Sequence, residues 1–154
     1  MTNLTPVTLD RVVETMKSFD VDLESLGDDG VAAVANLNDT AMTFAVLGSS
    51  LIVRGDVVTD RTLADADPTL HLAANQINSV TFGARATIAE HAENLIVRTE
   101  RDIPIAAGMN GEQLKTSLRG AVDAVLAAQD GLKAAAEDLE ELRKQVEAEL
   151  DGQA

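Results

Sequence analysis

The chain has 154 residues, and its 26 Asp and Glu against 12 Lys and Arg give a formal net charge of −14. That length is typical of a single domain, and an apolar content of 45% excludes a disordered chain. Such an acidic surface repels phosphate backbones and anionic bilayers, so we expect neither nucleic acid nor a membrane as a partner. The absence of Cys excludes disulfides, thiolate metal sites and Cys nucleophiles.

Targeting signals are also missing from the sequence. Residues 1–10 lack the basic stretch and apolar run of a signal peptide. No stretch reaches the roughly 18 apolar residues that a transmembrane helix needs. We therefore expect a cytoplasmic protein.

The first segment predicts a helix with one apolar face. Thr5 is a good N-cap, and Pro6 suits the first helical position. Apolar residues then recur at helical spacing, at Leu9, Val12, Val13 and Met16. The helix is predicted to begin at Thr5-Pro6 and to end near Phe19.

Residues 20–60 predict a β meander. Turn signals rich in Gly, Asn, Asp and Ser lie at 27–30, 38–39 and 48–50. The stretches between these turns predict strands over 31–37, 42–46 and 51–58. Turns this short join antiparallel neighbours.

A second helix is predicted to begin at Asp67-Pro68, with Asp as the N-cap. Its apolar residues share one face and are Leu70, Ala73, Ala74 and Ile77. Asn75 and Asn78 are unusual in a short helix, because Asn has a low helix propensity. Both therefore point to a specific role in capping, interface bonding or ligand contact.

Two further strands are predicted over 80–89 and 94–103, with Phe82 on the same face as Ala84 and a turn at His91-Ala92. This turn places Arg85 opposite Arg98. Two cations side by side form a candidate site for a carboxylate, a phosphate or an acidic peptide. The alternative is a solvated pair offset by Glu100, and a register shift of one residue removes the site.

The last predicted helix is the longest element. Asn110 and Gln113 form a capping-box pattern, and the helix extends to about Leu150. Its length is on the order of 60 Å, so in a compact domain it must bend, break or project. We predict a bend at Asp130-Gly131, because Gly weakens a helix interior.

A heptad seam follows this last helix. Apolar residues spaced by seven are Leu118, Val125, Leu132, Leu139 and Val146, with Ala121, Ala128, Ala135 and Leu142 at the companion positions. We expect the part up to about Leu126 to cover the core. Beyond Gly131 little core is left to cover, so we predict an intermolecular or folded-back contact there, with a frayed, solvated tail as the alternative. The candidate interface residues of this part are Leu132, Leu139, Leu142 and Val146.

No catalytic constellation is recognisable. Only His71 and His91 titrate near neutrality without perturbation, and Glu90, His91 and Glu93 share one turn and are expected to be solvated. Phosphate-binding, dinucleotide, metalloprotease and nucleophile-elbow motifs are absent. We expect no enzyme activity, no cofactor and no metal.

The predicted order is helix, three or four strands, helix, two strands, helix, which defines an α+β fold with an antiparallel sheet. This order resembles the YbjN family of bacterial sensory transduction regulators, which has the fold of type III secretion chaperones. The segments that carry the resemblance are Leu9–Phe19, Gly27–Gly30, Leu70–Asn78, Phe82–Val97 and Ile103–Leu114. They span about residues 8–130.

The resemblance implies a non-catalytic fold and a homodimer. By analogy, the second helix and the strand after it form the interface, with Leu70, Ala74, Asn75, Ile77 and Asn78 as candidate residues. The resemblance divides the chain into a YbjN-like domain, 1–130, and an acidic helical extension, 131–154.

Two functions from different classes follow. The leading hypothesis is a dimeric protein-binding module, chaperone-like or regulatory, whose acidic surface and apolar grooves hold a peptide of unknown identity. The alternative is a small-molecule sensor that binds an anionic ligand near Arg85 and Arg98, with Asn75 and Asn78 lining the pocket. An enzyme is a more distant third.

Overall fold

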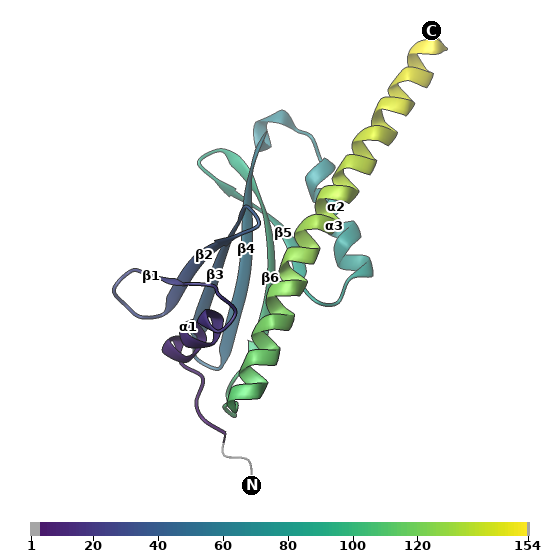
Figure 1. The fold of residues 1–154 in the computed structure, drawn as a ribbon. Coiled ribbons are helices and arrows are strands. Elements are labelled where there is room, and N and C mark those ends of the chain that lie inside the picture. The colour runs from purple at the N-terminus through teal and green to yellow at the C-terminus, as the bar shows by residue number, and fades with distance from the viewer. Residues whose placement is uncertain (1–3, 154) are drawn as a thin grey trace.

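The computed structural model describes residues 4–153 as three α-helices and six strands (Figure 1). The elements in chain order are α1 (Leu9–Lys17), β1 (Glu24–Leu26), β2 (Ala32–Leu37), β3 (Thr40–Leu47), β4 (Ser50–Thr62), α2 (Thr69–Val80), β5 (Arg85–His91), β6 (Asn94–Pro104) and α3 (Gly111–Gly152). A single 3₁₀ turn, η1 (Leu63–Asp65), joins β4 to α2. The predicted α+β class is confirmed, with a short strand β1 before the meander.

All six strands form one antiparallel sheet in the order β1-β2-β3-β4-β6-β5. Tight turns join β2 to β3 and β3 to β4, as the turn signals predict. β4 is the longest strand, with 13 residues, and it pairs with β3 on one side and β6 on the other. The hairpin β5–β6 therefore returns with β6 inward and β5 at the edge.

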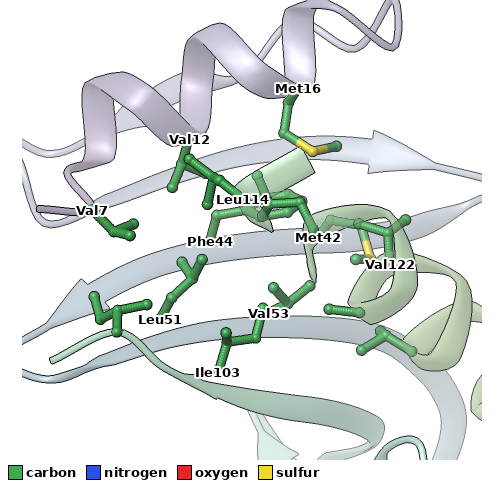
Figure 2. Packing of buried hydrophobic residues seen from close by; sticks show 14 of the residues in the cluster. Val7, Val12, Met16, Met42, Phe44, Leu51, Val53, Ile103, Leu114 and Val122 are labelled. Carbon is green, nitrogen blue, oxygen red and sulfur yellow. The ribbon is translucent and has the colours of Figure 1, made fainter. Parts of the chain in front are cut away.

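The three helices cover one face of this sheet, and α3 lies diagonally across it (Figure 1). A first cluster joins α1 and α3 to the middle strands, with Val12, Phe44 and Leu114 fully or almost fully buried (Figure 2). A second cluster joins α2, β5 and β6 to α3, around Ala73 and Leu132. Because aliphatic and Ala side chains dominate both clusters, the helices approach the sheet closely.

Gly55 of β4 sets the distance between the sheet and α3. A Cβ at this position would lie 2.8 Å from Cγ1 of Val125 and 2.9 Å from Cγ2 of Thr40. Two polar contacts tie the same region together. The hydroxyl of Thr99 donates to the carbonyl of Val125 at 3.0 Å, and the amide of Gln129 donates to the carbonyl of Gly55 at 3.1 Å.

The helix α3 is continuous and runs without a visible kink (Figure 1), so the predicted bend at Asp130-Gly131 is wrong. A Cβ at Gly131 would lie 3.2 Å from Cδ1 of Ile77. The Gly therefore lets α2 pack closely against α3 and does not bend the helix. Packing also passes residue 130, because Leu132, Ala135 and Ala136 belong to the second cluster.

Three local predictions differ from the structure. α1 begins at Leu9 with Thr8 as its N-cap, because Thr5 pairs with Met109 in an isolated bridge. Helix α2 extends to Val80, so β5 begins only at Arg85. Phe82 consequently precedes the strand and is fully exposed, whereas Ala84, which was predicted to share its face, is buried.

Candidate interaction surfaces

The end of α3 projects beyond the sheet, and residues 141–152 of this end are called the tail below (Figure 1). Residues 141–150 are all exposed. Three large apolar side chains on the tail form the exposed stripe, which consists of Leu142, Val146 and Leu150 with 55%, 46% and 62% exposed. They follow Leu139, which packs against the second cluster, at the spacing of one helix face. The stripe therefore continues the packed face of α3 past the end of the domain.

Ion pairs hold the base of the tail in place. Arg61 pairs with Glu140 and with Asp67, and Arg143 also pairs with Asp67 at 3.4 Å. The hydroxyl and backbone N–H of Thr69 donate to Asp67, and these hydrogen bonds hold the pKa of that carboxyl below its ordinary value of 3.8. Asp67 is therefore charged at neutral pH, and its ion pairs with Arg61 and Arg143 link the base of the tail to the segment before α2.

The predicted interface residues fall into two groups. Four of them, Leu70, Ala74, Ile77 and Leu132, are buried in the second cluster of this chain. Asn75, Leu142 and Val146 are exposed, and Leu139 is half-buried. The surface available to a partner is therefore smaller than predicted, and the predicted apolar residues that are exposed both lie on the tail. Leu150 belongs to it and was not predicted, although it follows Val146 by one helix turn.

The side chain of Asn78 hydrogen-bonds the backbone of the edge strand β5. Its side-chain amide donates to the carbonyl of Ala86 and accepts from the N–H of Ala86, both at 2.8 Å. The amide thus takes the place of a neighbouring strand at one residue of the edge strand β5. Asn78 therefore has a structural role in α2, because an apolar side chain could make neither hydrogen bond.

The predicted pairing of Arg85 with Arg98 is wrong. The turn lies at Ala92-Glu93, so Arg85 pairs with Glu100 and Arg98 with Thr87. Ala92 and Glu93 both have positive φ, at 49° and 74°, although neither is the Gly or Asn that normally signals such a turn. The sequence therefore places the turn one residue too early.

The face of the sheet without helices carries these arginines. Arg54 and Arg85 both bind Glu100, each at 2.9 Å, and Arg98 binds Asp56 through two parallel hydrogen bonds. Burial acts to raise the pKa of Glu100, but the two arginines outweigh it and hold the pKa below its ordinary value of 4.5. An anion near Arg85 or Arg98 must compete with these carboxylates, so the sensor alternative loses the geometry on which it was based.

Residues 4–153 contain neither a cluster of metal ligands nor a helix suited to cross a membrane. No group of three or more His, Asp or Glu side chains within that range gathers as a metal site would require. His71 and His91 are both exposed. Over the same described range, no helix combines the length and the apolar character needed to cross a membrane.

Comparison with known proteins gives a family and a fold. The model of the YbjN family, described as "Putative bacterial sensory transduction regulator", matches residues 8–134. The chain is similar to the crystal structure of YbjN, a putative transcription regulator from E. coli, with a TM-score of 0.68 and 12% identity over 88% of this chain and 96% of that chain. At this identity the likeness shows the fold alone.

A second solved structure is more distant. A chain of the HopA1–SchA chaperone–effector complex has a TM-score of 0.47 and 14% identity, covering 86% of this chain and 99% of that chain. A structural similarity with a TM-score this low supports no conclusion about function. No curated protein matches the chain.

Proposed function

This chain belongs to the YbjN family, and we propose that it is a non-catalytic protein-binding module of chaperone-like or regulatory use. Its docking element is the tail of α3. The observation that carries the proposal is the exposed stripe, because three large apolar side chains lie on one side of the end of α3, where the helix has left the sheet. A cytoplasmic location stays a prediction from the sequence.

The length of the tail favours a groove in a folded partner. At 1.5 Å per residue, residues 141–152 span about 18 Å, which is less than two heptads. A coiled coil needs three to four heptads to be stable by itself. Leu139, Leu142, Val146 and Leu150 instead have the spacing of the apolar anchors that a helix inserts into an apolar groove.

Charge specifies the rim of that groove. Four carboxylates lie on the tail, at Glu141, Glu147, Glu149 and Asp151. Its two cations are Arg143 and Lys144, and Arg143 already pairs with Asp67 and Glu147. The partner groove is therefore expected to be apolar along its floor and basic along its rim.

A second copy of this chain fits the tail less well. Glu149 follows Leu142 by seven residues and so occupies the next position of the seam. Two tails packed on each other would bury Glu149 of both copies side by side, which is costly without a cationic partner. The homodimer predicted from the family resemblance is therefore the alternative outcome that the test below must distinguish.

The test compares two triple variants with the wild-type chain. The stripe variant carries Leu142→Gln, Val146→Gln and Leu150→Gln. The matched control carries Glu141→Gln, Lys144→Gln and Ala148→Gln on the opposite side of the tail, which leaves the net charge unchanged. Gln has good helix propensity, so both variants keep the helix.

Proteins captured from lysate by the wild type are purified, and their affinities for all three chains are measured by calorimetry. Removing three anchors of more than about 1 kcal/mol each predicts a loss of affinity of at least about a hundredfold in the stripe variant and little change in the control. If no purified candidate shows this difference, the tail is not the docking element. A dimer that forms in light scattering with wild type and control but not with the stripe variant would assign the tail to a second copy.

A further inference from the structure

A groove of about 480 Å³ lies between α3, the far end of β4 and the turn that joins β2 to β3. Its size falls within the range of small-molecule sites, roughly 300–1,000 Å³. It is separate from the exposed stripe, because its α3 residues lie between Gln129 and Glu140 and precede the tail. Its charge also differs from that of the face that carries Arg54, Arg85 and Arg98, because five carboxylates and only two cations line the groove.

The groove has an apolar base and an acidic rim. The base includes Leu70, Val97 and Leu132. The rim includes Asp60, Asp130 and Glu137, all three exposed. Such a lining suits a ligand that combines a methylene chain with a positive charge.

Gln129 supplies a second, independent feature. Only 8% of this residue is exposed, and its Nε2 donates to the carbonyls of Gly55 and Val97 at 3.1 and 2.9 Å. Both partners are acceptors, which fixes the orientation of the amide and directs Oε1 elsewhere. Within residues 4–153 no group donates to Oε1, and this oxygen is not sealed off from solvent. Since Gln129 lines the groove, its solvent-accessible Oε1 offers an acceptor there that an N–H or O–H group of a ligand can use.

We propose that this groove binds a protonated alkyl amine. Its ammonium donates to Oε1 of Gln129 and is attracted by Asp130 and Glu137, while its methylene chain lies on the apolar base. Arg61 does not neutralise the rim, because Asp67 and Glu140 already hold its guanidinium. Lys133, the other cation of the lining, is exposed and competes with the ligand for the same carboxylates.

The probe is 1,5-diaminopentane, titrated into the full chain and followed by calorimetry and backbone NMR at low ionic strength. We expect saturable binding with shifts confined to the segments that line the groove, which are residues 38–40, 57–61 and 129–140 together with Leu70 and Val97. The neutral analogue 1,5-pentanediol has a chain of the same length and is expected to bind at least about tenfold more weakly, since it cannot use the carboxylates. Nα-acetyl-lysine amide separates the two sources of such an amine. Affinity equal to that of the diamine means that a lysine side chain of a protein suffices, and much weaker binding means a free amine.

Variants locate the site and separate it from general charge attraction. Asp130→Asn with Glu137→Gln is expected to weaken diamine binding about tenfold. Asp123→Asn with Glu141→Gln makes the same change of charge outside the groove on the same helix and is expected to change it less than about twofold. Lys133→Gln should strengthen binding severalfold. Equal affinity for the diol, equal loss in both double variants, or shifts outside the groove would each overturn the proposal. These outcomes are independent of whether the tail binds a protein.

Discussion

The position of Gly55 offers a sharp test of how α3 meets the sheet. Ala at this position places a Cβ 2.8 Å from Cγ1 of Val125 and 2.9 Å from Cγ2 of Thr40. Both neighbours are β-branched and buried, so neither can rotate away freely. The helix must therefore shift, which also stretches the bond from Gln129 to the carbonyl of Gly55.

Two opposing effects set the size of the change. Overpacking of a buried site costs about 1–3 kcal/mol. Ala in a strand interior is favoured over Gly by roughly 0.5–1 kcal/mol through the unfolded chain. We therefore expect Gly55→Ala to lower the free energy of unfolding by about 1–2 kcal/mol and Tm by roughly 2–8 °C, since 1 kcal/mol shifts Tm by about 2–4 °C at this size.

Urea unfolding monitored by circular dichroism measures this loss, with an unchanged m value as the sign that the unfolded state is not altered. Gly120→Ala is the matched control, because a Cβ there meets nothing within 4 Å and Ala is the better helix former by about 1 kcal/mol. In a Val125→Ala background the cost of Gly55→Ala should shrink, since the closest contact is gone. An unchanged or raised stability of Gly55→Ala, or the same cost in both backgrounds, would refute the close-packing argument.

Three further predictions concern single residues. Asn78→Ala should lower the free energy of unfolding by about 1–3 kcal/mol in urea unfolding, because both edge bonds to Ala86 are lost, whereas the exposed Asn75→Ala should change it by less than about 0.5 kcal/mol. Glu93→Gly should raise Tm measured by calorimetry, because Gly relieves about 1 kcal/mol of strain at a φ of 74°; a lower Tm would contradict this. The pKa of Glu100 is lower in the folded state than its ordinary value of 4.5, so its stabilising effect is present above that pH and is lost as the pH falls below it. Glu100→Gln should therefore be less stable at neutral pH and lose less stability between pH 5 and 3, and parallel pH profiles would contradict the assignment.

The sequence by itself determined the class of the fold and much of its order. Local signals were enough for the meander, because short turns rich in Gly, Asn and Asp force neighbouring strands to pair. They were also enough for the start of α3, where Asn110 and Gln113 form the capping box at 2.8 and 2.9 Å. Each of these features depends on residues a few positions apart.

Other features depended on contacts between distant residues, which only the tertiary structure supplies. In the sequence Gly131 predicts a break or bend in the helix. In the structure the helix is continuous, and the missing side chain of Gly131 leaves room for Ile77 of α2. The β5–β6 turn uses two residues without turn preference, because the many bonds of the paired strands outweigh about 1–2 kcal/mol of strain at each.

The candidate binding surfaces were likewise predicted only in part from the sequence. The heptad seam predicted an apolar face over the whole of α3, and the face exists. Where that face leaves the domain is decided by how far α2 and the sheet extend, so the seam alone could not separate buried Leu132 from exposed Leu142. Gln129 gave no signal at all in the sequence, since its role arises from two strand carbonyls that lie 32 and 74 residues away along the chain. The sequence thus determined which faces are apolar, and the tertiary structure decided which of them remain open to a partner.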